Sequence, residues 1–133
     1  MIGGIPTPQD DSLLLQDTTT KTASFNSAGF DLGAGFAPGA LGMAAAAVVD
    51  VSAADRANSD ETYTFKLQES SDNSTFADIG VATSITVSGA TSTLGVYVAK
   101  GFISKRYVRL VLTAAGTTPS ITYKAWLNTT FQR

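Results

Sequence analysis

The side chains that could carry catalytic chemistry in this sequence are carboxylates, because the 133 residues include no His and no Cys. Without an imidazole or a thiol there is no Ser-His or Cys-His nucleophile pair, and no zinc site of ordinary ligands. Hydrolysis by carboxylates needs two acids that face each other across a cleft. The acids nearest to such a role lie in or beside expected turns: Asp60, Glu61, Glu69, Asp72 and Asp78.

We interpret these five acids as solvated turn residues. The series Asp72, Ser74 and Asp78 does not match a calcium loop, which needs a central Gly and a terminal bidentate Glu. The Gly-rich stretch 33–39 lacks the Lys-Ser/Thr of a P-loop, so we interpret it as a loop between strands. We therefore expect a protein that is not an enzyme, with no metal, no cofactor and no small-molecule substrate.

The charge balance gives no support for binding to nucleic acids or membranes. Nine Lys and Arg oppose eleven Asp and Glu, for a formal net charge of -2. Binding to a phosphate backbone normally requires a basic field. Residues 1–17 have no early Lys or Arg, and Asp10 and Asp11 stand where a signal peptide has its apolar core. We expect no nucleic-acid partner, no membrane partner and no export signal.

Nearly half of the positive charge lies within ten residues, at Lys100, Lys105, Arg106 and Arg109. If Val108, Leu110 and Leu112 point inward along a strand, then Lys105, Tyr107 and Arg109 form an outer face together with Val111. One interpretation is a solvated sheet face with ordinary cross-strand ion pairs, each of which contributes little stability. The other is a contact patch for an acidic partner surface.

Trp126 is the only Trp, and alternation places it on the face opposite Ile121, Tyr123 and Leu127. Three interpretations are open: the core of a sheet that is covered on both faces, an anchor in a protein interface, or a platform for ligand stacking.

The N-terminal residues 1–17 are expected to form an extended arm or a first strand. Gly3-Gly4, Pro6 and Pro8 oppose regular pairing, whereas Ile2, Ile5 and Leu13 to Leu15 are apolar side chains that need cover. Either 13–15 form a first core strand, or the arm docks on a neighbouring subunit. Residues 18–133 are expected to form one domain.

The elements that must position these residues are strands. Apolar and polar side chains alternate with a period of two in 62–68, 84–88, 94–98, 107–112 and 121–127. Shorter strands are expected at 20–25 and 28–32. The stretch 43–49 contains four consecutive Ala, but its flanking Gly42 and β-branched Val residues favour a strand that is apolar on both faces. The sequence therefore predicts an all-β, antiparallel two-sheet β-sandwich of jelly-roll or immunoglobulin type.

Three segments resemble the small jelly-roll capsid cement, or decoration, proteins of tailed bacteriophages, especially short-tailed ones. They are Asp31-Leu32-Gly33 before a loop, Glu69-Ser70-Ser71-Asp72 followed by Phe76, and 105–110 followed by the Gly116 turn. The resemblance covers roughly residues 12–128. The Ser-Asp turn and the Arg-Tyr-Val-Arg-Leu strand are also similar to discoidin-type carbohydrate-binding sandwiches, whose Asp-Gly-Trp-like turn and terminal Cys pair this chain lacks.

The resemblance implies a non-enzymatic homodimer in the virion that binds the outer surface of an HK97-type major capsid protein shell and ties neighbouring capsomers together. The alternative is a module that binds virion or cell-surface glycans. The residues expected to contact the capsid or a partner are Ile2, Ile5, Pro6, Pro8, Lys105, Tyr107, Arg109 and Trp126.

Overall fold

The computed structural model describes residues 13–33, 43–55, 60–86 and 94–128, and within them nine strands and no α-helix. The strands are β1 (Leu14–Lys21), β2 (Phe25–Asn26), β3 (Phe30–Asp31), β4 (Met43–Ala54), β5 (Thr62–Ser70), β6 (Ala77–Thr86), β7 (Gly95–Ile103), β8 (Tyr107–Ala115) and β9 (Ile121–Asn128). This confirms the all-β prediction.

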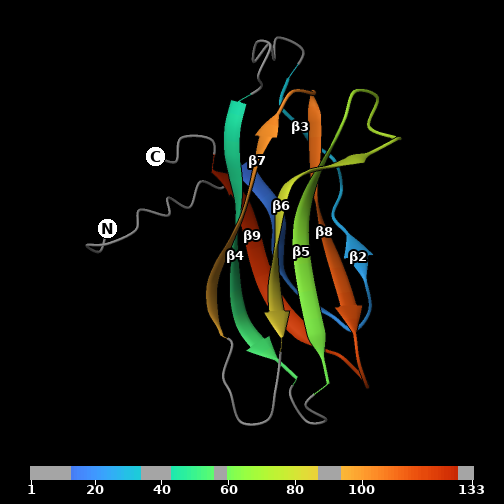
Figure 1. The fold of residues 1–133 in the computed structure, drawn as a ribbon, viewed down its shortest axis with the longest axis vertical. Coiled ribbons are helices and arrows are strands. Elements are labelled where there is room, and N and C mark those ends of the chain that lie inside the picture. The colour runs from blue at the N-terminus through green and yellow to red at the C-terminus, as the bar shows by residue number, and fades with distance from the viewer. Residues whose placement is uncertain (1–12, 34–42, 56–59, 87–93, 129–133) are drawn as a thin grey trace, which may run out of the picture.

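The strands form two antiparallel sheets that pack face to face in an elongated sandwich (Figure 1). We call the layer β1-β9-β4-β7 sheet A and the layer β6-β5-β8-β2, with β3 also paired to β8, sheet B. The pairs β1·β9, β2·β8, β4·β7 and β5·β6 are nested around the β5–β6 turn. The chain is therefore paired like one long hairpin that is folded over on itself.

The core lies between the inward faces of the two sheets. Tyr63, Phe65 and Leu67 of β5 are fully buried, as their alternation predicts. They face the inward row of sheet A, and the rings of Phe65 and Tyr123 meet edge to face with centroids 5.0 Å apart. Such aromatic pairs add about 0.5–1.5 kcal/mol beyond the area that they bury.

The Ala-rich stretch forms a strand and not a helix. Ala45, Ala47 and Val49 belong to the core cluster, and Ala46 and Val48 on the opposite face are also buried. A strand that is apolar on both faces is stable only where both faces are covered. The burial of both faces here confirms the strand prediction for 43–49. The small Ala side chains suit a strand that is enclosed in this way.

Two glycines allow sheet A and sheet B to join along one side. Among the described residues, β6 and β7 pair at Val81 and Lys100. Next to this bridge Gly80 has a φ of 70°, and a Cβ there would lie 1.8 Å from the carbonyl oxygen of Lys100. Gly101 approaches Gly80 from the other strand. Only a residue without a side chain fits at this crossing.

Several sequence-based boundaries differ from the structure. The strand expected over 84–88 is β6, which begins seven residues earlier, at Ala77. The strands expected over 43–49 and 94–98 extend further, to Ala54 and Ile103. The strand expected over 20–25 is wrong, because β1 ends at Lys21 and β2 begins at Phe25. The strand expected over 28–32 is reduced to β3. The boundary between 17 and 18 falls inside β1, in which Leu15 belongs to the core. The strand interpretation of Leu13 to Leu15 therefore holds for Leu14 and Leu15, whereas Leu13 directly precedes β1 and packs against the core.

Candidate functional site

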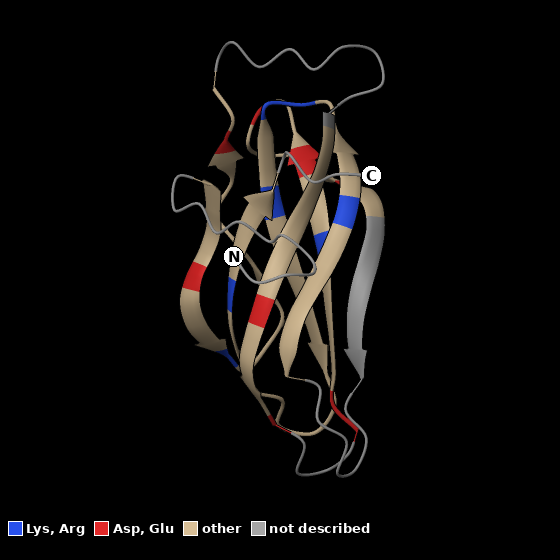
Figure 2. Cartoon of the chain, turned by 90° about the vertical axis from the view of Figure 1, so that its left-hand side faces the viewer, with Lys and Arg blue, Asp and Glu red and all other residues tan. Residues whose placement is uncertain are grey.

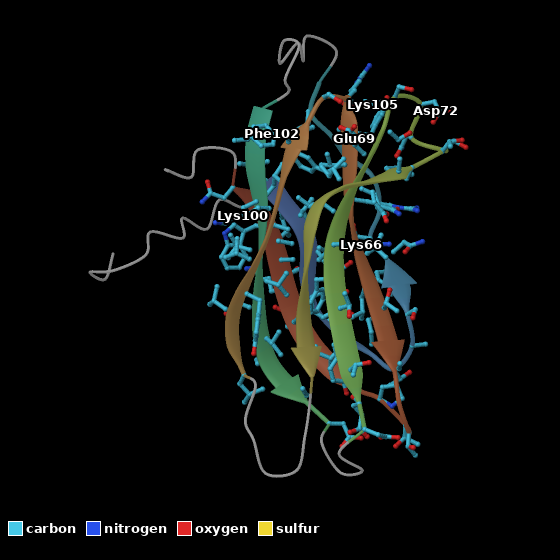
Figure 3. The ribbon with its side chains drawn as sticks, in the orientation of Figure 1. Lys66, Glu69, Asp72, Lys100, Phe102 and Lys105 are labelled. Atoms are coloured by element: carbon cyan, nitrogen blue, oxygen red, sulfur yellow. The ribbon has the colours of Figure 1, made fainter. Side chains whose placement is uncertain are left out.

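The outer face of sheet B carries the predicted cationic residues. Val108, Leu110 and Leu112 of β8 point into the core, so Tyr107 and Arg109 point outward as expected. Lys105 lies in the turn between β7 and β8 and is exposed (Figure 3). The alternation of β8 was enough to predict the outward side of Tyr107 and Arg109. Lys105 precedes this strand, and Val111, which was expected on the same outer face, is only 8% exposed.

A row of polar side chains crosses this face from β6 to β8, at the level where Asp78, Gln68 and Arg109 are register partners. The Gln68 amide donates to Asp78 Oδ1 at 2.7 Å, and Arg109 Nε donates to Gln68 Oε1 at 2.9 Å. Lys66 Nζ lies 3.0 Å from Asp78 Oδ2. The guanidinium of Arg109 lies over the ring of Phe76, 4.1 Å from its centroid.

The electrostatics of this row follow from these contacts. The hydrogen bond from Gln68, and then that from Lys66, hold the pKa of the Asp78 carboxyl below its usual value. At the end of the face, Arg106 donates from Nε and Nη2 to the two oxygens of Asp31, at 2.7 and 2.9 Å. That bond lowers the pKa of Asp31 and raises the pKa of Arg106. Arg106 was not among the predicted contact residues.

The patch is therefore less cationic than the sequence indicates. Arg109 and Arg106 are held by neighbours of the same face, which agrees with the interpretation of a sheet face with cross-strand pairs. The sequence does not predict the hydrogen bonds between strands that hold these side chains in position. The result is a polar surface on which several side chains are held by one another, and which we call the β5–β8 patch: Lys66, Gln68, Phe76, Asp78, Lys105, Tyr107 and Arg109. Acidic and basic segments are interspersed over the molecule (Figure 2).

Two of the five acids interpreted as solvated turn residues are buried instead. Glu61 is 0% exposed and Glu69 is 9% exposed. Both continue the inward row of Tyr63, Phe65 and Leu67 at the two ends of β5, so the period of two that predicted the row also predicts this orientation. Glu69 accepts hydrogen bonds from the backbone and hydroxyl of Ser104 at 2.8 and 3.0 Å. Both carboxyl oxygens of Glu61 lack a hydrogen-bond partner.

The other three acids lie at the surface, as expected. In the β5–β6 turn, Asp72 Oδ1 accepts hydrogen bonds from the Ser70 hydroxyl and from the amides of Ser74 and Thr75, at 2.8, 2.9 and 2.9 Å. These bonds, led by that of Thr75, lower the pKa of Asp72 to about 2. Asp60 accepts from the amide and hydroxyl of Thr117, which lowers its pKa.

Trp126 lies on the outer face of sheet A and is 4% exposed. Val48, its register partner on β4, is buried with it. Of the three interpretations, the described side chain fits a sheet that is covered on both faces, and its ring does not form an open stacking platform. Its indole nitrogen is buried and has no hydrogen-bond partner.

Exposed large apolar side chains gather on one strand that the sequence did not single out. Among the described side chains they are Leu94, Val96 and Phe102, with 49%, 51% and 61% exposed. All three belong to the outward row of β7 or directly precede it. Both rows of β7 are apolar, so the period of two identifies the two faces without saying which of them is covered.

The remaining predicted contact residues, Ile2, Ile5, Pro6 and Pro8, lie outside the described residues. Within 13–33, 43–55, 60–86 and 94–128, no group of three or more His, Cys, Asp or Glu is placed to hold a metal ion. The same residues contain no helix of the length and apolarity that crossing a membrane requires.

Comparison of the chain with protein-family models gives no match, and comparison with curated protein sequences gives none either.

Proposed function

We propose that the chain is a non-enzymatic structural protein of a phage virion, which binds the outer surface of an HK97-type capsid shell and cements neighbouring capsomers as a homodimer. The sequence resemblance is the starting point of this proposal. It is supported by the chemistry of the chain, which offers no imidazole or thiol, and by the five candidate acids, which are either buried singly or held at the surface by neighbouring groups.

The jelly-roll form of the sandwich is part of the same proposal. A jelly roll is a double sheet of eight strands built from two Greek keys. The nested pairs around the β5–β6 turn and the two four-strand orders, β1-β9-β4-β7 and β6-β5-β8-β2, support this connectivity.

The observation that carries the proposal is the β5–β8 patch. A site for a small molecule is usually a concave pocket with a few convergent polar groups. Here the polar groups bond to one another across three strands, on a surface that carries both charges, a half-buried Arg109 and the ring of Phe76. Arg and aromatic side chains that are already ordered suit a broad protein surface, because little side-chain entropy remains to be lost on docking.

Cementing follows if each copy holds the shell at more than one point. The arm before β1 carries apolar side chains at Ile2 and Ile5, and β1 starts at Leu14 on the edge of sheet A. When a patch and an arm belong to one dimer, the binding of one raises the effective concentration of the other at its own site. Such a dimer bridges capsomers that are already fixed in a lattice.

Co-sedimentation with expanded HK97-type shells of a short-tailed phage tests the proposal. We expect saturable binding of the wild-type chain, and an affinity at least about tenfold weaker for Lys105→Glu, because the new carboxylate would repel the acidic partner surface that this patch is proposed to contact. Lys21→Glu is the matched control, since it makes the same charge change on β1 of the other sheet and should bind like the wild type.

The absence of binding to shells would contradict the proposal. Binding to a glycan array with no affinity for shells would favour the carbohydrate-binding alternative instead. Equal loss of affinity in Lys105→Glu and Lys21→Glu would contradict the role of the β5–β8 patch while leaving shell binding in place.

A further inference from the structure

Arg109 is held in position at one nitrogen, while its two terminal nitrogens remain available. Its Nε donates to Gln68 Oε1 at 2.9 Å, and its guanidinium carbon lies 4.1 Å from the centroid of the Phe76 ring. Within the described part of the chain, Nη1 and Nη2 take part in no hydrogen bond or ion pair, and neither is buried. The outer edge of this guanidinium is therefore open to a partner.

One support of the guanidinium comes from β5 and β6. Gln68 Nε2 donates to Asp78 Oδ1 at 2.7 Å, and this bond determines which way the amide of Gln68 faces, so that its oxygen is left for Arg109. The other oxygen of Asp78 lies 3.0 Å from Lys66 Nζ. The charge of Asp78 is thus balanced by Lys66, and among the described residues the charge of Arg109 has no anion of its own.

The second support is the ring of Phe76, which packs on the connection between β2 and β3. A Cβ added at Gly29 would overlap the side-chain oxygen of Asn73 and would lie 3.3 Å from Phe76 Cζ. Both side chains therefore use the space that Gly29 leaves. Asp72 accepts three hydrogen bonds within the same β5–β6 turn, which fixes the chain just before Phe76. The ring then attracts the cation that lies over it.

This arrangement fits a carboxylate. A guanidinium presents its N–H groups in a planar fork that matches the two oxygens of a carboxylate. A surface Arg normally loses side-chain freedom when it binds, but Arg109 is already held at Nε and over the ring of Phe76, so less freedom remains to be lost. A nucleic-acid phosphate backbone fits less well, because the chain has a net charge of -2 and Asp78 lies in the same row.

We propose that Arg109 is the carboxylate-binding residue of the β5–β8 patch. Its Nη1 and Nη2 donate to the side chain of an Asp or Glu on the capsid protein, and Gln68 and Phe76 position the guanidinium for this contact. The inference rests on the proposed function, and it narrows the acidic partner surface to one carboxylate bound at one residue.

A substitution that keeps the charge separates the fork from the charge. Arg109→Lys supplies a single ammonium group, so we expect its affinity for expanded HK97-type shells, measured by co-sedimentation, to be at least about tenfold weaker than that of the wild type. Arg106→Lys is the matched control, because it makes the same substitution at an Arg whose Nε and Nη2 already bond to Asp31. It should bind within about twofold of the wild type. Circular dichroism verifies that each variant folds.

A double-mutant cycle tests whether Gln68 acts through Arg109. Gln68→Met removes the acceptor of Nε, and we expect it to weaken shell binding by about threefold or more. In a chain that already carries Arg109→Lys, the same change should alter the affinity by less than about twofold, because no fork remains to be positioned. Equal losses in the two backgrounds would overturn the positioning role of Gln68, since a general perturbation of the sheet would act in both.

A peptide probe tests the contact without shells. NMR spectroscopy of the full chain follows the Nε–Hε signal of Arg109 during titration with hexaglutamate and, as a control, with hexaglutamine. We expect the signal to shift with hexaglutamate only. No shift, or the same shift with both peptides, would overturn the inference.

The shell and peptide experiments distinguish the inference from the proposed function. Shell binding that is weakened by Lys105→Glu but not by Arg109→Lys would contradict the role of Arg109 alone. A shift of the Arg109 signal with hexaglutamate in a chain that does not bind shells would contradict the proposed function alone.

Discussion

Glu61 and Glu69 occupy the two ends of one inward row and have opposite hydrogen-bonding environments. The carboxylate of Glu69 accepts from the backbone and hydroxyl of Ser104, whereas the carboxylate of Glu61 has no partner. A buried polar group without a hydrogen bond costs about 1–3 kcal/mol, and removing an acceptor from a buried donor costs about as much. The same substitution should therefore have opposite effects at the two positions.

We expect Glu61→Met to raise the free energy of unfolding by about 1–3 kcal/mol, because it removes an unpaired carboxylate and keeps the volume. Glu69→Met should lower it by about 1–3 kcal/mol, because the Ser104 amide and hydroxyl lose their acceptor. Urea denaturation of both variants at pH 7 measures the difference. Equal destabilisation by both changes would contradict this explanation of Glu61.

Asp72 makes the stability of the β5–β6 turn depend on pH. Its carboxylate is bound by three donors, and its pKa of about 2 lies below the usual value of 3.8. A carboxyl group whose pKa is lowered in the folded state stabilises that state at pH values above its usual pKa. This contribution is lost as the pH falls from about 4 through 2. The neighbouring Asn73 adopts a positive φ of 58°, which Asn tolerates better than most residues.

Asp72→Asn keeps an oxygen acceptor but removes the charge. We expect a lower melting temperature than the wild type at pH 7, and a difference that shrinks toward pH 2, where the wild-type carboxyl is being protonated. Thermal unfolding followed by circular dichroism across this range provides the test. A difference that persists unchanged at pH 2 would show that charge is not the reason.

At the scale of elements, alternation predicted β5, β8 and β9, found only the end of β6, and failed for the short strands. The inward rows of β5, β8 and β9 could be read from the sequence, because one face of each is apolar and the other is mixed. β2 and β3 have two residues each, too few for a period to be recognised. Their pairing with β8 depends on contacts distant in the sequence, such as the Ser27 hydroxyl, which accepts from the Leu110 amide at 2.8 Å.

The candidate site could be predicted only in part for a related reason. The outward direction of Tyr107 and Arg109 follows from one strand, but the bonds of Arg109 to Gln68 and Phe76 join three separate segments. The burial of Trp126 likewise depends on what covers the outer face of a sheet, which a single strand does not encode. The exposure of Val96 also depends on what covers its face of the sheet, which the strand by itself does not encode.

The joint between the two sheets depends on Gly80. We expect Gly80→Ala to destabilise the protein by about 1–3 kcal/mol or more, because the new methyl group would overlap the Lys100 carbonyl. Gly33→Ala is the control, since Gly33 has a φ of 104° but a Cβ added there would meet no atom within 4 Å. The backbone strain in Gly33→Ala is at least as large as in Gly80→Ala. A greater loss of stability in Gly80→Ala would therefore come from the close contact between β6 and β7.

Chemical denaturation of the two glycine variants makes this comparison. A larger loss of stability in Gly33→Ala would mean that backbone conformation, and not the approach of two strands, makes Gly80 necessary. The close approach of β6 to β7 would then no longer explain where the two sheets meet.

At the scale of the whole molecule, the arm and the sandwich are expected to have separate roles. Leu15 is in the core and β1 pairs with β9, so the sandwich already includes the chain from Leu14 onward. Removing residues 1–9 should leave the domain folded with little change in melting temperature, yet weaken its attachment to capsid shells. Ordering a segment on binding has an entropic cost, so the arm contributes most where its partner is already fixed.

Trp126 provides an internal readout for this truncation, because it is the only Trp and is 4% exposed. We expect its fluorescence emission to stay that of a buried indole in the truncated chain. Loss of folding would mean that residues 1–9 belong to the core. Unchanged affinity for shells would mean that they have no role in attachment.

The claim that the protein cements capsomers is tested most directly by calorimetry of expanded HK97-type shells with and without the saturating wild-type chain. A ligand that binds the assembled lattice and not its separated parts must raise the temperature at which the lattice comes apart. We expect the shell transition to shift upward as the chain is added and to stop shifting when its sites are full. A shell transition that stays at the same temperature at saturating concentrations would contradict the account.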